Sequence, residues 1–505
     1  MRAPRYAGLA WFLCGFTGGI ATSLLWSGSA GALLLLAVTG LGAAALFEQR
    51  SPGKPAALLG LLAGLDAFVV SLVISPPCKY PLEGFERSPD GTFQAVCETQ
   101  QLGGLAILAG AGTLAIAGLV WILDRHRKNR TDDRSQPEAR GGNNVQLACA
   151  AVAVLGCVAV VAPVLAVNSW SPTALVRMAV DDELRFYALE QQPDFALFNS
   201  ESHYDGIYFY AVANDPLARG EPHQVIDLAS HRYAHPLYGW LGWLFSAGHG
   251  PAVPFVMMLI SIVAMAVAAV MTSRLAEHLG MSPWWGLFPS VTPGLLASVS
   301  WDTAEPLAAA VVTGGLLYWL RGQKFLGGVL LIAVCMTRQP FSVIPIGLAA
   351  WELLRRRQGQ STRETIQRLT ILAAGPVCMV LWQIYLRTRF EEWPFETADL
   401  VLTVPFQGWS EALRLAAVIG GGEFAQLGLL SLPMLAAHLL AALIVTSRAL
   451  QMRNPIAPVF IALILIWYAF DQSAIVFTKD LLRFSAIPWL LAPFVLARMD
   501  RDTYD

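Results

Sequence analysis

Apolar stretches of about 20 residues recur along almost the whole chain. A helix needs about this length of mainly apolar sequence to cross the hydrocarbon core of a bilayer. Windows of that size predict spans near 7–27, 29–47, 55–76, 102–123, 146–169, 251–272, 283–300, 303–320, 368–387, 424–447, 456–477 and 483–498. The stretch 326–353 is interrupted by Arg338-Gln339-Pro340, so we expect two short helices there that meet near the outer surface. The predicted fold is therefore all-α, a polytopic transmembrane bundle of about 14 spans.

The composition agrees with a membrane protein. Of 505 residues, 55% are hydrophobic and only 14% are charged, and the mean hydropathy is +0.52. Soluble domains carry about 25% charged residues. The balance of 34 basic and 36 acidic residues argues against a nucleic-acid partner.

The distribution of Lys and Arg predicts the orientation, because cytoplasmic segments are enriched in both. With the N-terminus inside, the basic segments 125–130 and 355–357 are cytoplasmic. The loop 171–250, with ten Asp and Glu against four Arg, is then outside. We therefore expect a multi-pass protein of the plasma membrane with both termini cytoplasmic and this loop extracytoplasmic. No cleavable signal peptide is evident at the start of the chain.

The predicted spans divide the chain into three regions. Residues 1–123 form an N-terminal block of four spans, 124–145 form a polar cytoplasmic linker, and 146–505 form the second transmembrane domain. Cys78 and Cys97 share one outer loop of the first block. Since that compartment permits disulfides, we predict a structural Cys78–Cys97 bridge, with two free thiols as the alternative.

The outer loop 171–250 concentrates the polar chemistry of the chain. Five of the eight histidines fall between residues 203 and 249, among aromatic and acidic side chains. This density indicates an active site at the outer membrane interface. A solvated loop with an aromatic belt is the alternative.

Two short motifs in this loop resemble those of a known family. They read Tyr-Asp-Gly-x-Tyr-x-Tyr at 204–210 and Arg-Tyr-x-x-Pro-Leu at 232–237, the second leading into the next span. This pattern resembles the bacterial integral-membrane glycosyltransferases of the GT-C superfamily, which includes the mannosyltransferases of GPI-anchor synthesis. The resemblance covers roughly residues 146–340, and the N-terminal four-span block departs from it. It implies a GT-C-like core, an Asp in the first large outer loop, a polyprenyl-phosphate sugar donor and inversion at the sugar carbon.

Asp205 is the predicted catalytic base. An inverting transfer needs a carboxylate to take the proton of the acceptor hydroxyl, and Gly206 lets the backbone turn closely beside it. A turn-forming Asp-Gly pair is the structural alternative. Asp181 and Asp182 are rivals, either as the base or as ligands of a divalent metal. The predicted reaction requires no cofactor, and the sequence does not decide whether a divalent metal takes part.

The remaining site predictions fall into two groups. A leaving phosphate needs positive charge, and the candidates are Arg232, His235, Arg338 and Arg483. The candidates for binding the sugar or acceptor are His203, Tyr204, Tyr208, Tyr210, Asp302 and Glu305. For Arg338, which interrupts an apolar stretch, the alternative is an internal salt bridge to Glu305 or Asp302.

These residues favour a glycosyltransferase of the cell envelope, which moves sugar from a polyprenyl-phosphate donor to a glycan, lipid or protein hydroxyl at the outer face. The main alternative is a transporter or flippase of lipid-linked glycans, which would place polar groups near the bilayer midplane. A polysaccharide polymerase or ligase and a non-catalytic assembly partner are further alternatives. The oligomeric state does not follow from the sequence.

Overall fold

A computed structural model describes residues 141–357, 359–397, 402–417, 431–452, 454–476 and 478–496. In these ranges the regular secondary structure is helical, and pairing between extended segments is limited to isolated bridges. The α-helices are α5 (Gly141–Val167), α6 (Arg185–Gln191), α7 (Gly206–Asn214), α8 (Ala229–Arg232), α9 (Leu237–Phe245), α10 (Val253–His278), α11 (Pro293–Ser300), α12 (Glu305–Leu320), α13 (Lys324–Thr337), α14 (Val343–Arg357), α15 (Thr362–Phe390), α16 (Pro394–Thr397), α17 (Gln407–Ala417), α18 (Ser431–Ala449), α19 (Ile456–Tyr468), α20 (Gln472–Val476) and α21 (Thr478–Val495). The all-α prediction is confirmed for this part of the chain.

Among the described residues, three helices are long and apolar enough to cross a membrane: α5, α10 with the turn before it, and α15. Shorter apolar helices are α12, α13, α19 and the second half of α18. Many side chains on the long helices are exposed and apolar, as lipid contact requires. A membrane protein is therefore supported by helix length and composition.

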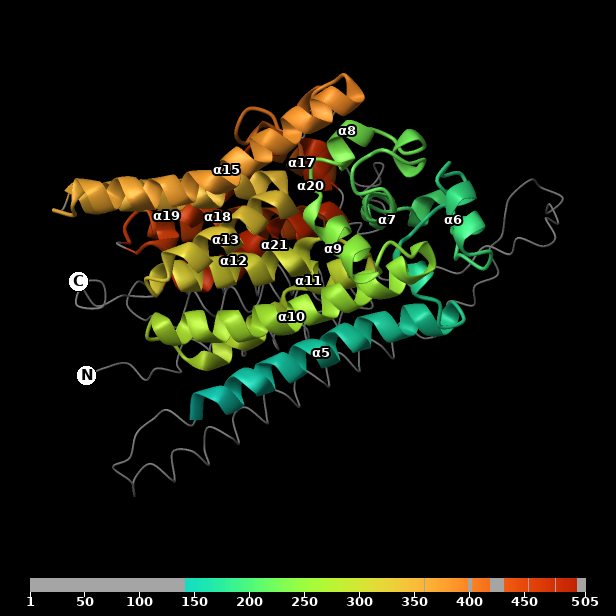
Figure 1. Cartoon of the computed structure of the whole chain (residues 1–505). Coiled ribbons are helices and arrows are strands. Elements are labelled where there is room, and N and C mark those ends of the chain that lie inside the picture. Colours follow the sequence, from blue (N-terminus) through green and yellow to red (C-terminus); the bar gives the residue numbers. More distant parts are fainter. Residues whose placement is uncertain are drawn as a thin grey trace, which may run out of the picture.

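The helices form one packed bundle (Figure 1). Helix α10 packs against α5 and α12, α12 packs against α13, and α13 packs against α15. On the other side, α14 packs against α19, and α11 and α19 pack against α21. Helix α21 thereby lies next to α11 and α12, although more than 150 residues of chain separate it from either.

Two predicted spans are not continuous helices. The stretch 283–300 divides into a 3₁₀ segment η6 (Pro283–Val291) and the short helix α11. Prolines at 283, 289 and 293 explain this, since proline lacks an N–H and breaks the regular hydrogen-bond ladder. The stretch 456–477 is likewise divided, with α19 ending at Tyr468 and α20 beginning at Gln472.

The predicted interruption at Arg338 is confirmed. Helix α13 ends at Thr337, Arg338 is extended, and a 3₁₀ turn η7 (Gln339–Ser342) leads into α14. The predicted linker 124–145 is too long, because α5 already begins at Gly141. The N-terminal four-span block, with Cys78 and Cys97, lies outside the described residues.

The loop 171–250 carries the short helices α6 to α9, which gather at one end of the bundle (Figure 1). Helix α7 packs against α9, and α9 packs against α10. An isolated bridge between Ala179 and Phe198 closes the base of the loop. The loop is therefore a packed structure on the end of the bundle.

Candidate functional site

A cavity of about 630 Å³ opens where the loop helices meet the end of the bundle. Its charged and imidazole lining comes from four regions of the chain: Asp205, His231, Arg232, His235, Glu305, Arg338, Asp480 and Arg483. Apolar side chains make up most of the rest of the lining, and we call them its apolar wall; they include Phe341, Phe395, Leu463, Ile466, Trp467, Phe470, Phe484 and Pro488. The cavity therefore combines a charged wall with an apolar wall.

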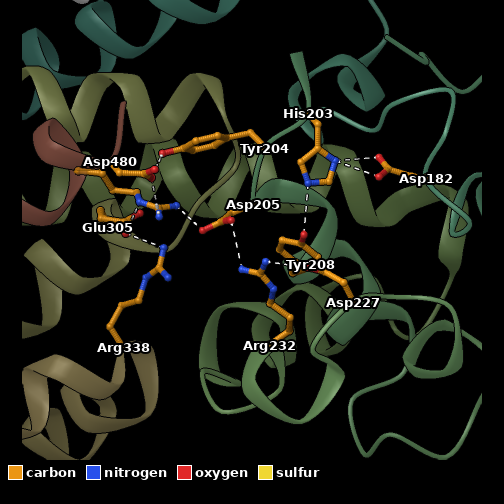
Figure 2. A network of polar contacts seen from close by, with 11 residues as sticks. Asp182, His203, Tyr204, Asp205, Tyr208, Asp227, Arg232, Glu305, Arg338 and Asp480 are labelled. Atoms are coloured by element: carbon orange, nitrogen blue, oxygen red, sulfur yellow. Dashed lines mark hydrogen bonds and ion pairs between the residues drawn. The ribbon is translucent and has the colours of Figure 1, made fainter. Parts of the chain in front are cut away.

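Asp205 immediately precedes α7, and two arginines share its carboxylate (Figure 2). Arg232 Nη1 lies 3.4 Å from Oδ1, and Arg483 Nη1 donates to Oδ2 at 2.5 Å. Arg232 comes from the end of α8, whereas Arg483 comes from α21, 278 residues along the chain. The predicted base and two predicted phosphate ligands therefore meet as an ion-pair cluster.

Arg483 also contacts two further carboxylates. Its Nη2 donates to Asp480 Oδ1 at 3.0 Å, and its Nε lies 3.6 Å from Glu305 Oε1. Arg338 Nη2 lies 2.6 Å from the same Glu305 oxygen. The internal salt bridge that was the alternative for Arg338 is therefore present, and Arg338 also lines the cavity.

The arginines control the protonation of Asp205. Burial by itself raises the pKa of this carboxyl, but the charges of Arg483, Arg232 and Arg338 outweigh burial and hold the pKa well below its usual range. Asp205 is thus ionised at neutral pH and, in this arrangement, a weak base.

The two residues that flank Asp205 hold it in place. A Cβ on Gly206 would lie 2.6 Å from the Trp301 carbonyl oxygen and 2.7 Å from that of Val176, so only glycine fits between them. The prediction that Gly206 allows close backbone approach is confirmed. The side chain of Tyr204, on the other side of Asp205, donates from its hydroxyl to Asp480 at 2.8 Å.

A second chain of contacts leads from the loop to Arg232 (Figure 2). His203 Nδ1 lies 3.0 Å from the Asp182 carboxylate, and its Nε2 lies 3.2 Å from the Tyr208 hydroxyl. The guanidinium of Arg232 stacks 3.6 Å from the centre of the Tyr208 ring and also pairs with Asp227 at 3.2 Å. Burial lowers the pKa of His203, but the hydrogen bond to Asp182 and the negative charges of Asp182, Asp205 and Asp227 together outweigh burial and raise the pKa above its ordinary value.

Two histidines line the cavity as neutral groups. Burial and then the charge of Arg232 lower the pKa of His231 to about 4. Burial and then Arg338 lower the pKa of His235 well below its ordinary value. His235 Nδ1 accepts the backbone N–H of Gln339 at 3.3 Å. At neutral pH the cavity therefore has neutral imidazoles for polar contacts.

Other predicted site residues lie away from the cavity lining. Asp182 accepts the Ala179 N–H at 2.5 Å, and Asp181 accepts the Ser200 hydroxyl at 2.7 Å, so both fasten the loop. Tyr210 is buried against Phe195. The cavity lining does not include these residues, nor His203, Tyr204 and Asp302.

Asp302 is fully buried between α11 and α12 and accepts the Tyr238 hydroxyl at 2.6 Å. Burial raises its pKa to about 7. This carboxyl joins the loop helix α9 to the bundle. Among the described residues, no group of three or more His, Cys, Asp or Glu is arranged to hold a metal ion.

The cavity lining contains two titratable residues that the sequence interpretation did not select, Asp480 and His231. Asp480 had a usable signal, because it lies three residues before Arg483, the spacing of neighbours on one helix face. His231 directly precedes Arg232, which was selected. No family model, no curated protein and no solved structure matches this chain.

Proposed function

We propose that this protein is an inverting membrane glycosyltransferase with a GT-C-like core of about 14 spans. It takes sugar from a polyprenyl-phosphate donor and transfers it to a hydroxyl acceptor at the outer face of the plasma membrane. One observation carries the proposal: a single cavity joins a carboxylate–arginine cluster to an apolar wall. A lipid-linked sugar phosphate requires both in one site.

The two walls suit the two parts of such a donor. The prenyl chain fits the wall of Phe470, Phe484 and Trp467, where apolar burial is favourable. Arginine binds phosphate oxygens through paired N–H groups, and Arg338 and Arg483 lie beside that wall.

The proposed reaction is an inverting transfer of the sugar to the acceptor hydroxyl. The acceptor oxygen attacks the anomeric carbon from the face opposite the phosphate, a C–O bond forms, and the bond from that carbon to the phosphate oxygen breaks. The electron pair leaves with the prenyl phosphate, whose added negative charge the arginines stabilise. The acceptor proton passes to a carboxylate oxygen of Asp205. The charge and atoms balance without a cofactor.

Substitution of Asp205 tests this proposal. The full chain in lipid nanodiscs is incubated with radiolabelled polyprenyl-phosphate sugars and a panel of glycan and lipid acceptors. Removal of a general base costs about 10²–10⁴-fold in rate, so Asp205→Asn is expected to lower kcat by that factor. Because the variant also removes a carboxylate that pairs with two arginines, it is expected to unfold earlier, and activity is compared at a temperature at which both proteins are folded.

Asp181→Asn is the matched control, because Asp181 fastens the loop outside the cavity. It is expected to retain activity. Full activity of Asp205→Asn together with loss of activity in Asp181→Asn would indicate that Asp181, and not Asp205, is the base. Movement of the lipid-linked sugar across the bilayer without transfer would indicate the flippase alternative.

A further inference from the structure

The charges that line the cavity compensate one another. The cavity lining includes three arginines, at 232, 338 and 483, and three carboxylates, at 205, 305 and 480. An anionic ligand therefore meets no free excess of positive charge there. To bind through arginine, it must compete with a carboxylate that already holds that arginine.

Arg483 is the arginine best arranged to change partner. It contacts Asp205, Asp480 and Glu305 through three different nitrogens. It can therefore release one carboxylate while the other two keep it in place. Arg232, in contrast, is held by Asp227 and by stacking on Tyr208.

We infer that the donor phosphate activates Asp205 by drawing Arg483 away from it. This inference rests on the proposed function and deepens it. In the empty cavity, the Asp205–Arg483 pair keeps the carboxylate from acting as a base. When the phosphate group binds Arg483, Asp205 loses its shortest charge-assisted hydrogen bond and gains an anionic neighbour. Both changes favour proton uptake by Asp205.

The arrangement couples two steps of one reaction. The carboxylate becomes a better base only when the phosphate is seated, so it does not activate water in the empty site. The released guanidinium is then next to the oxygen that leaves with the prenyl phosphate, where negative charge increases during the reaction. The same arginine thus restrains the base before binding and stabilises the leaving group afterwards.

Several charged or titratable groups face Asp205 and bear on its proton affinity. They are Arg483 and Asp480 from α21, Arg232 and His231 from α8, Arg338 after α13, Glu305 at the start of α12, and His203, Tyr204, Tyr208, Asp227 and His235 from the loop. The two arginines that contact Asp205 directly dominate, and only Arg483 has alternative carboxylate partners within the cavity.

Binding of an unreactive phosphodiester tests the inference independently of catalysis. The probe is farnesyl methyl phosphate, a prenyl phosphodiester that carries one negative charge and does not titrate near neutral pH. If Asp205 competes with phosphate for Arg483, Asp205→Asn is expected to bind the probe about tenfold more tightly than the wild type, or better. The matched control is Asp227→Asn, which removes an exposed carboxylate that pairs with Arg232 outside the cavity lining. It is expected to change affinity much less.

Calorimetry in buffers of different ionisation enthalpy provides the second measurement. Binding at pH 4–5 is expected to be accompanied by more proton uptake in the wild type than in Asp205→Asn. The bound anion also favours protonation of His231, whose pKa is about 4, in both proteins, so the difference between them reports the carboxyl of Asp205. Equal or weaker binding by Asp205→Asn, or equal uptake in both proteins, would overturn the inference.

The outcomes separate the two proposals. Tighter binding and proton uptake without any sugar transfer would support the coupling and contradict the glycosyltransferase proposal. Sugar transfer with no competition between Asp205 and the probe would support the glycosyltransferase proposal and contradict the coupling. Failure of the probe to bind either protein would remove the donor site and the coupling together.

Discussion

His203 connects the folded loop to the charged cluster, although it lies outside the cavity lining. It bridges Asp182, which fastens the loop, and Tyr208, on whose ring Arg232 stacks. A raised pKa means that the folded protein binds the His203 proton more tightly than the unfolded chain does. The protonated pair with Asp182 therefore contributes to stability.

The pH dependence of this contribution has a definite sign. It is fully present below the unfolded-state pKa of about 6.5 and is lost as the pH rises through the raised pKa of the folded state. His203→Gln is thus expected to unfold about 1–3 °C earlier than the wild type at pH 5.5. The difference should shrink at pH 8.5. Thermal unfolding at both pH values checks this, and a difference that grows with pH would contradict the ion pair.

Residue types were predictable at this scale, but most of their partners were not; the Arg338–Glu305 pair was anticipated as an alternative. Asp205 was selected from a motif that resembles that of a known family, and Arg232 and Arg483 were selected because a leaving phosphate needs positive charge. Their pairing depends on α21 lying beside the loop, 278 residues from Asp205 in the chain. Local sequence therefore predicted a base and a set of phosphate ligands, whereas the tertiary structure brings them together as an ion-pair network.

At the scale of helices, the contact of α11 with α21 fixes where Arg483 lies. A Cβ on Gly294 of α11 would meet the carbonyl oxygen of Leu482 at 2.0 Å, directly before Arg483. Such a contact requires glycine, because real Cβ atoms do not approach backbone that closely. The breaks that make α11 short come from prolines and were readable in the sequence. The close approach of α11 to α21 could not be predicted from the sequence, because a glycine does not specify which helix packs against it.

Gly294→Ala tests whether this contact positions the cluster. The added methyl group must push α21 away from α11, which costs about 1–3 kcal/mol of stability and moves Arg483 relative to Asp205. We expect earlier thermal unfolding and weaker binding of farnesyl methyl phosphate. Gly156→Ala in α5 is the control, since its Cβ would make only ordinary contacts, at 3.6 and 3.8 Å. If both variants behaved like the wild type, the α11–α21 contact would not position the site.

Across the described part of the molecule, the candidate site and the basic cluster Arg355–Arg357 lie at opposite ends of the bundle. Helix α15 begins close to Arg355–Arg357, which end α14. Its last turns contact α8, which carries Arg232. Because Lys and Arg favour the cytoplasmic side, this polarity predicts that the cavity opens at the outer face, where a lipid-linked donor of the outer leaflet can enter.

Labelling of single cysteines with a membrane-impermeant maleimide tests this orientation in intact cells. The background protein has its native cysteines replaced by serine. Glu221, in the loop, and Arg356, at the basic end, are both exposed. Glu221→Cys is expected to label in intact cells, whereas Arg356→Cys should label only after the membrane is permeabilised. The reverse pattern would place the cavity on the cytoplasmic side, where a donor in the outer leaflet could not reach Arg483, and would therefore exclude transfer at the outer face even if Asp205 proved essential.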